Sequence, residues 1–185
     1  DALSFSGHKI GASKGTGVLV YHRTIRLLSP LQGGEQERGL VPGTVNVPGA
    51  VALETALREK VEHRDENEIK MRGLMAYLKE NLASIPELVF NSPENGSPYV
   101  LNCSLLEHKA SVVVEALSQK EIYISSVSAC STHNEAISHV LLAMGKSEIE
   151  AGNSLRISMP LYTTKEEIDQ FVSTLKTILK ETHPR

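Results

Sequence analysis

Residues 47–83 have the pattern of helix almost without interruption, and this length constrains the fold more than any other feature of the sequence. Asn46 is suited to cap the helix, and Pro48 fits its first turn. A continuous helix of this length would extend about 55 Å, which is longer than a small domain is wide. We therefore expect one long helix or a kinked pair over residues 47–84, linking two domains, with a boundary near Ser84.

The segment before this helix, residues 1–46, combines short strands with glycine-rich connections. Residues 3–6 and 17–21 are apolar runs bounded by breakers, which predicts two strands joined by a tight connection. Residues 33–44 are rich in glycine and contain a proline, so we expect a loop there and no regular element.

The segment after the helix, residues 85–185, alternates between strand and helix patterns. Leu101, Cys103 and Leu105 fall on one face of a half-buried strand, so Cys103 is expected in the core. The sequence predicts an α/β fold with strands at residues 88–90, 99–105, 122–125 and 155–158, and with helices at 109–119, 135–144 and after the Thr164–Glu167 capping box.

The amino-acid composition of the chain argues against several classes of function. The chain has 185 residues, of which 41% are hydrophobic and 22% charged, as in globular proteins. Its net charge of −3 and aromatic content of 4% argue against nucleic-acid binding. No apolar run approaches the ~20 residues of a membrane span. The two cysteines form neither a disulfide framework nor a zinc pattern, and the histidines lack metal-ligand spacing, so we expect no metal and a reducing, cytoplasmic location.

Lys9 follows a strand and precedes a glycine-containing turn, with Ser6 and His8 beside it. A lysine becomes a nucleophile toward carbonyl groups when its surroundings lower its pKa, and hydroxyl and imidazole donors can hold a phosphate. The alternative is an ordinary surface lysine at the end of a strand.

Two further residues could carry chemistry. Cys130 lies in a run of small polar residues after a strand, close to His133 and to a predicted helix, and such surroundings favour a reactive thiolate. An inert, half-buried cysteine is the alternative. Arg156 stands between Leu155 and Ile157 in a predicted strand and could clamp a carboxylate with its planar guanidinium. Its alternative is an edge-strand arginine that faces water.

Four blocks of sequence, in this order, resemble the NifS-like cysteine desulfurases, a branch of the class V aminotransferase family within the type I fold of pyridoxal-phosphate enzymes. They are Ser-Phe-Ser-Gly-His-Lys at 4–9, the glycine-rich run with Pro-Gly-Thr and Asn-Val-Pro-Gly at 33–49, Ser-Ala-Cys-Ser at 128–131, and Ser-Leu-Arg-Ile-Ser at 154–158.

The resemblance implies a role for each candidate. Lys9 aligns with the lysine that attaches pyridoxal 5′-phosphate covalently, and Ser6 and His8 align with phosphate-binding groups. Thr44 aligns with a residue that reaches the phosphate in the neighbouring subunit, which implies a homodimer with shared sites. Cys130 aligns with the nucleophile, and Arg156 with the clamp on the substrate carboxylate.

The implied reaction converts L-cysteine to L-alanine and leaves a persulfide on Cys130, from which a sulfur-acceptor or scaffold protein takes the sulfur. Iron–sulfur cluster assembly, tRNA thiolation and another route are all open as destinations of the sulfur. The resemblance also implies that 1–46 is the end of the cofactor-binding large domain, 47–84 the linking helix or helix pair, and 85–185 the small C-terminal α/β domain with the reactive-cysteine loop.

Some features depart from the family pattern. Ala12-Ser13 replaces a Gly-Pro pair, Leu40-Val41-Pro42 stands shortly before the Gly-Thr pair where an arginine is usual, and Val127 replaces a glycine. Because Lys9 lies so close to the start, we expect a piece of a longer polypeptide that lacks the aspartate and histidine facing the cofactor ring, and little activity from this chain alone. The alternatives are a selenocysteine lyase or another class V enzyme, and a non-catalytic module that binds partners.

Overall fold

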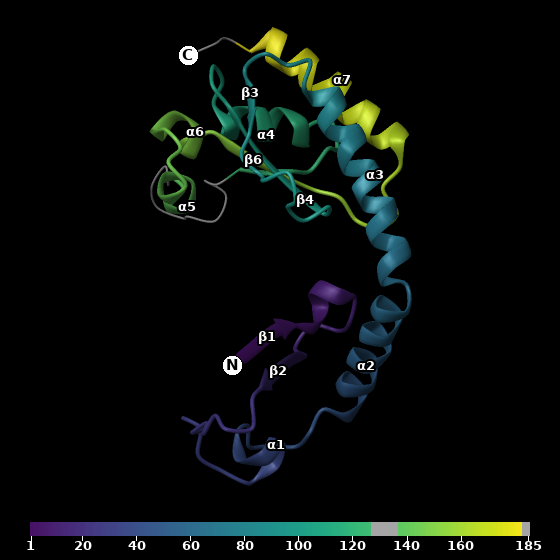
Figure 1. Cartoon of the computed structure of the whole chain (residues 1–185), viewed down its shortest axis with the longest axis vertical. Helices are drawn as coiled ribbons and strands as arrows, with labels where there is room; N and C mark the ends of the chain where they lie inside the picture. The colour runs from purple at the N-terminus through teal and green to yellow at the C-terminus, as the bar shows by residue number, and fades with distance from the viewer. Residues whose placement is uncertain (127–136, 183–185) are drawn as a thin grey trace. The chain divides into compact units, whose positions relative to one another are not determined.

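The computed structural model describes residues 1–126 and 137–182, and these fall into two compact units, Asp1–Asp65 and Glu66–Arg185. Figure 1 shows a small strand pair with helices in the first unit and a sheet with several helices in the second. The architecture is therefore mixed α/β, as the sequence predicted. Within the described residues, no helix is both long enough and apolar enough to cross a membrane.

The first unit opens with a hairpin that confirms both predicted strands. β1 (Ala2–Ser6) pairs antiparallel with β2 (Gly17–Tyr21). Between them, η1 (Gly7–Ile10) is a 3₁₀ turn that ends at Gly11, whose φ of 97° lies in the left-handed region that glycine adopts without strain. This turn carries Lys9, so the position of the lysine is set by a closed turn at the end of a strand.

Two buried glycines allow the close approach of η1 to the start of α2 (Val47–Glu62). A methyl group added at Gly7 would overlap the hydroxyl of Thr16, and one added at Gly49 would lie 2.8 Å from the Thr16 methyl carbon. The N–H of Gly7 also donates to the carbonyl of Thr16 (2.9 Å). Thr16 therefore fills the space between two backbones that only glycine leaves open.

The glycine-rich segment contains one short turn, α1 (Gln36–Gly39), where the sequence predicted no element. The N–H of Gly39 donates to the carbonyl of Glu35 (3.0 Å), which closes the turn. Glu37 and Arg38 have φ values of 49° and 58°, so two consecutive non-glycine residues occupy the left-handed region. Such backbone conformations cost free energy, and the pattern of the sequence does not reveal them.

The predicted helical stretch is a pair of helices. α2 ends at Glu62, and α3 (Arg64–Leu82) begins after His63, whose φ of −104° and ψ of 14° are not helical. The N–H of Gly49 donates to Oδ1 of Asn46 (3.0 Å), which confirms the predicted cap. α2 belongs to the first unit, and α3 from Glu66 onward belongs to the second.

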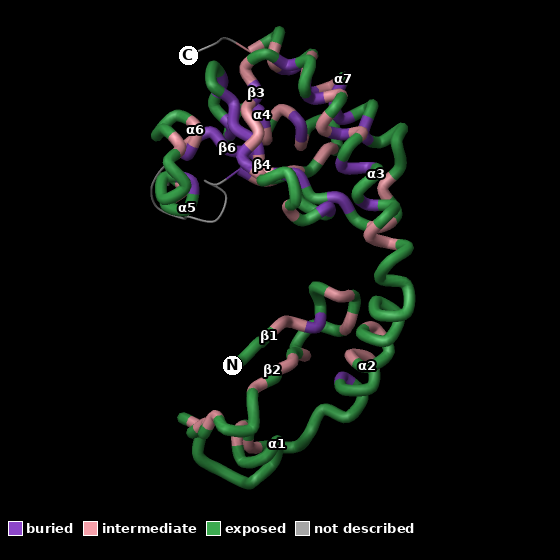
Figure 2. The backbone as a smooth tube through the Cα atoms, viewed as in Figure 1, coloured by how far each residue is buried: buried purple, intermediate pink, exposed green. Residues whose placement is uncertain are grey.

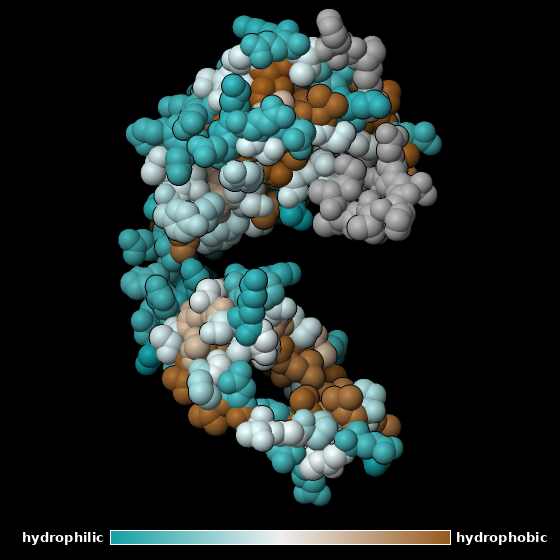
Figure 3. Space-filling view, turned by 180° about the vertical axis from the view of Figure 1, so that it is seen from behind, coloured by the Kyte–Doolittle hydropathy of each residue, from teal (hydrophilic) through white to brown (hydrophobic). Residues whose placement is uncertain are grey.

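The first unit buries little of its own surface (Figure 2). Among its described residues only Gly7 and Gly49 are buried. Apolar side chains gather on its surface instead, as Figure 3 shows in brown. Their exposed fractions range from 40% to 82%, and the group includes Leu3, Leu19, Val20, Leu28, Val51, Leu57 and Val61.

The second unit contains a four-stranded antiparallel sheet in the order β3-β4-β6-β5. Its strands are β3 (Leu88–Phe90), β4 (Val100–Leu105), β5 (Ser125–Ser126) and β6 (Ser154–Ser158). The helices of the unit, besides α3, are α4 (Ala110–Ser118), α5 (His139–Ala143), α6 (Glu148–Gly152) and α7 (Lys165–Glu181).

One face of this sheet packs into a continuous apolar core with three helices. α3, α4 and α7 supply buried side chains at helical spacing, and the strands supply alternate residues. Cys103 is fully buried among them, as predicted. The core comprises Met71, Leu74, Met75, Leu78, Leu82, Ile85, Leu88, Leu101, Cys103, Leu105, Ala110, Val113, Leu117, Leu155, Ile157, Met159, Ile168, Phe171, Val172, Leu175 and Ile178.

Three local predictions in this unit need correction. The strand predicted at 122–125 is limited to Ser125–Ser126, because only these residues pair with β6. The helix predicted at 135–144 begins at His139 within the described residues, capped by Ser138. Its predicted end is right, since Gly145 has a φ of 81°. The prediction missed α6, although Ser147 and Glu150 form a capping box like that of α7.

Candidate active site

Lys9 and Ser6 line one hollow beside the hairpin of the first unit. The β1 residues Ser4 and Phe5 and the β2 residues Gly17, Val18 and Leu19 complete its wall. Lys9 is exposed, so its amine can reach a bound molecule. Ser6 caps η1 without using its side chain for a cap hydrogen bond, so its hydroxyl is available to a ligand there.

The chemistry of these groups fits pyridoxal 5′-phosphate. A primary amine attaches an aldehyde, a hydroxyl donates to a phosphate oxygen, and Phe5 with Leu19 offers an apolar wall to a ring. His8 follows Gly7 on η1 and is exposed, and it does not line this hollow within the part of the chain that the structure describes. The hollow brings together two of the four residues that the resemblance assigns to the cofactor.

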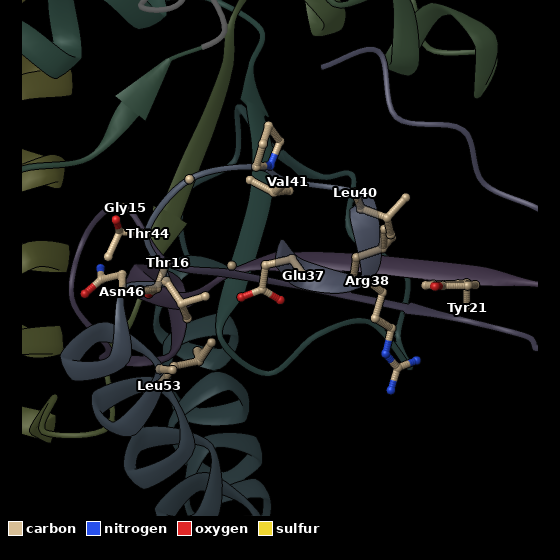
Figure 4. A pocket seen from close by; sticks show the side chains of 16 residues that line it. Gly15, Thr16, Tyr21, Glu37, Arg38, Leu40, Val41, Thr44, Asn46 and Leu53 are labelled. Atoms are coloured by element: carbon tan, nitrogen blue, oxygen red, sulfur yellow. The ribbon is translucent and has the colours of Figure 1, made fainter. Parts of the chain in front are cut away.

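Thr44 lines a second, larger hollow of the same unit, shown in Figure 4. Thr44 lies at one end of it with Thr16 and Asn46, and Tyr21 and Arg38 lie toward the other end. Gly17 and Leu19 of β2 line both hollows, which are therefore neighbours on the hairpin. Val41 contributes an apolar side chain to the wall of this second hollow.

Arg156 lies on the opposite face of the sheet from the core of the second unit. It alternates along β6 with the buried Leu155 and Ile157, and its own side chain is exposed. Its Nη2 donates to Oγ of Ser125 (3.2 Å) on the neighbouring strand. Because β6 lies between β4 and β5, Arg156 is on an inner strand and not on an edge, which removes the alternative of an edge-strand arginine.

Of the two cysteines, Cys103 lies within the described residues and Cys130 does not. Cys103 is fully buried, and burial raises the pKa of its thiol to about 12, so it forms no thiolate near neutral pH. Cys130, the predicted nucleophile, lies outside the described residues. Its role stays a prediction.

The structure adds two residues beside Arg156 that the sequence reasoning did not select. Asn102 on β4 and Ser125 on β5 are the cross-strand partners of Arg156 on its two sides. The alternation of β4 that places Cys103 in the core also places Asn102 on the polar face, so a signal for Asn102 was present in the sequence.

Comparison with known proteins gives a consistent result at three levels. The family model described as Aminotransferase class-V matches residues 1–171. Curated relatives named cysteine desulfurase IscS, from Salmonella arizonae and Salmonella newport, are each 35% identical over 179 residues, which is 95% of this chain and 44% of the relative. The chain thus spans less than half the length of the curated relatives it matches.

Solved structures agree with the sequence relatives. A structure titled NifS-like protein is 33% identical and superimposes with a TM-score of 0.87, covering 98% of this chain and 47% of that one. The NifS-like protein from Rickettsia africae is 27% identical, also with a TM-score of 0.87, and covers 97% of this chain and 48% of its own. DndA from Streptomyces lividans is 33% identical with a TM-score of 0.68.

Proposed function

The chain belongs to the class V aminotransferase family, and from this premise we propose that it supplies the cofactor-anchoring lysine and the substrate clamp of a cysteine desulfurase. The observation that carries the proposal is the hollow shared by Lys9 and Ser6 at the end of β1. The curated relatives named cysteine desulfurase support the choice of reaction within the family.

In the proposed site, Nζ of Lys9 attaches pyridoxal 5′-phosphate, and the Ser6 hydroxyl and the His8 imidazole donate to its phosphate. Thr44 reaches the phosphate bound to a second subunit. When bound, the cofactor supplies an electron sink that eases bond breaking at the α-carbon of an amino acid. The amine of Lys9 would also move the proton at that carbon.

Arg156 holds the substrate through its carboxylate. The guanidinium is a planar fork that matches two carboxylate oxygens, and the hydrogen bond from Nη2 to Ser125 fixes its orientation. The exposed position of Arg156, beside a sheet face that carries polar residues, supports this role.

The proposed reaction transfers one sulfur atom from L-cysteine to Cys130. The thiolate of Cys130 attacks the substrate sulfur, an S–S bond forms and the Cβ–S bond breaks. The electron pair of the broken bond stays on Cβ, which takes up a proton to give L-alanine. The persulfide on Cys130 then passes to a sulfur-acceptor or scaffold protein.

We also propose a homodimer and a cytoplasmic location. The exposed apolar side chains of the first unit, among them Leu19 and Val20, are suited to a covered interface. The free thiol of Cys103 is compatible with a reducing compartment.

Reductive labelling tests the site assignment directly. The chain is mixed with pyridoxal 5′-phosphate, treated with borohydride to fix any covalently attached pyridoxyl group, and mapped by mass spectrometry. We expect the label on Lys9, with the nearby exposed Lys14 as the internal control. Labelling of Lys14 and other surface lysines to the same extent as Lys9 would overturn the assignment.

The reaction itself is tested by adding L-cysteine to the protein in the presence of pyridoxal 5′-phosphate. We expect L-alanine to form from L-cysteine, and Cys130→Ser to abolish it, with Cys103→Ser as the matched control. Unchanged sulfur release from the Cys130 variant would favour a lyase that needs no cysteine nucleophile.

A further inference from the structure

We propose that Asn102 forms a second contact to the carboxylate held by Arg156, and that a partly buried hydrogen-bond chain starting at the carbonyl of Glu150 orients its amide for this contact. The proposal rests on the proposed function in one respect only, namely that Arg156 binds a carboxylate.

The strand register places the two side chains together. Asn102 of β4 and Arg156 of β6 are Cα partners in an antiparallel pair, and both point to the face opposite the core. Side chains in such pairs have Cβ atoms about 5 Å apart. Ser125 is the partner of Arg156 on the other side and accepts from its Nη2. A carboxylate on Arg156 therefore has Asn102 as its neighbour on the β4 side.

A chain of hydrogen bonds decides which end of the Asn102 amide faces a ligand. The hydroxyl of Ser104 donates to the carbonyl of Glu150 (2.7 Å), so its oxygen must accept from any further partner. Nδ2 of Asn91 donates both to that oxygen (2.7 Å) and to Oδ1 of Asn102 (2.8 Å). With Oδ1 engaged by Asn91, the NH₂ group of Asn102 is left free, and within the described residues it has no protein partner.

The reverse arrangement of these amides is less favourable. If the Asn91 amide were turned, its oxygen could accept from Ser104 and from Asn102, but its NH₂ group would be orphaned in a buried place. The carbonyl of Glu150 would also lose the Ser104 hydroxyl, and it lies in the last turn of the five-residue helix α6, where carbonyls lack intrahelical partners. The observed arrangement makes three hydrogen bonds and leaves Oδ1 of Asn91 as the orphan.

The Arg156 guanidinium and the Asn102 NH₂ group therefore form a row of hydrogen-bond donors on the face of the sheet opposite the core. A carboxylate accepts about four hydrogen bonds, and the Arg156 fork uses two of them. The Asn102 NH₂ group can take a third on the adjacent side. Asn102 is neutral, so it does not form an ion pair with Arg156 in place of the ligand. Its NH₂ group adds specificity for a ligand that carries a hydrogen-bond acceptor.

Nuclear magnetic resonance of the ¹⁵N-labelled chain tests this inference without relying on catalysis. The probes are L-alanine, which carries the carboxylate, and L-alaninamide, which replaces it with a neutral amide. We expect the Arg156 Nε–H and Asn102 NH₂ signals to shift together with L-alanine, with a common Kd, and to stay in place with L-alaninamide.

Variants of Asn102 give the second readout. Asn102→Asp keeps the shape and still accepts from Asn91, but it presents an acceptor to the ligand, so we expect L-alanine to bind about tenfold more weakly or worse. Asn95→Asp makes the same change at an exposed loop position and should leave the Kd unchanged. Ser104→Ala should broaden the Asn102 NH₂ signals, because the amide then loses its fixed orientation.

The outcomes separate the inference from the function on which it rests. A response of Arg156 with a silent Asn102 overturns the inference and leaves the clamp intact, and silence of both signals overturns the inference together with the clamp. If both signals respond to L-alanine while borohydride labelling of Lys9 fails, the Asn102 contact stands and the desulfurase assignment falls.

Discussion

Nδ1 of His108 lies 2.8 and 2.9 Å from the two carboxylate oxygens of Glu87, and both side chains are almost completely buried. The other ring nitrogen, Nε2, lies 3.2 Å from the carbonyl of Thr182, the residue that caps the end of α7. Both nitrogens thus face acceptors, which an imidazolium satisfies and a neutral ring cannot. The pair ties the start of β3 to the end of the last helix.

This arrangement makes stability depend on pH. Burial lowers the pKa of His108, but the hydrogen bonds to Glu87 and to Thr182 outweigh it, so the pKa lies above its ordinary value. The stabilisation is therefore fully present below the unfolded-state pKa of about 6.5 and is lost as pH rises through the higher folded-state pKa. We expect Glu87→Gln to lower the free energy of unfolding by about 1–3 kcal/mol at pH 6, and to have a smaller effect above the folded-state pKa.

Thermal unfolding of the wild type and of Glu87→Gln across this pH range measures the difference. Glu107→Gln is the matched control, because Glu107 is exposed and acts on His108 only through its charge. A gap between Glu87→Gln and wild type that is the same at every pH would show that His108 does not titrate in this contact.

The reactivity of Cys103 provides a second test. Because the thiol is fully buried and its pKa is raised to about 12, we expect iodoacetamide to leave Cys103 unmodified in the native chain at pH 8 and to modify it in denaturant. Peptide mass mapping distinguishes the two cysteines. Rapid native modification of Cys103 would contradict its position in the core.

The glycine contacts around Thr16 provide a third prediction. We expect Gly7→Ala to destabilise the first unit by about 1–3 kcal/mol, because the added methyl group overlaps the Thr16 hydroxyl. Faster hydrogen exchange along β1 and β2 would report this loss. Gly73→Ala is the control, because the space around Gly73 in α3 is open. There the same change should stabilise the helix by about 0.5–1 kcal/mol.

The capping box of α7 provides a fourth prediction. The N–H of Glu167 donates to the Thr164 hydroxyl (3.3 Å), and the Glu167 carboxylate accepts the N–H of Thr164 (2.9 Å). We expect Thr164→Ala to lower the free energy of unfolding by about 1 kcal/mol in urea titrations. Ser173→Ala, at an exposed position inside the same helix, should cost nothing. Equal losses in both variants would mean that the cap contributes no more than an ordinary surface hydroxyl.

The local sequence pattern was sufficient to predict a helix or strand where the element's own residues stabilise it. The strict alternation of β4 and the apolar spacing of α7 with its capping box predicted both elements and the faces they bury. β5 could not be predicted in the same way, since Ser125 and Ser126 form a strand only through pairing with β6. The break at His63 was one of two possibilities, because neither proline nor glycine marks it.

The residues of the candidate site also differ in how far the sequence alone could identify them. For Lys9 and Arg156 the local pattern left an ordinary surface residue as the alternative, and the four-block resemblance selected them as candidates. The alternation of β4 could place Asn102 on its face, but the orientation of its amide needed the structure, because it depends on Asn91 and on a hydrogen-bond chain that begins at Glu150, distant in sequence. Cys130 remains a prediction.

Neighbouring residues of β4 and β6 serve opposite faces of the sheet, and this has a consequence for how the protein can change. A substitution at 102 or 156 alters what the open face recognises and leaves the packing of Cys103 and Leu155 untouched, so new ligand preferences can arise at little risk to folding. The insertion of a single residue in β4 does the reverse. It would turn the core side chains beyond it toward the ligand and the polar ones toward the interior, losing both properties together.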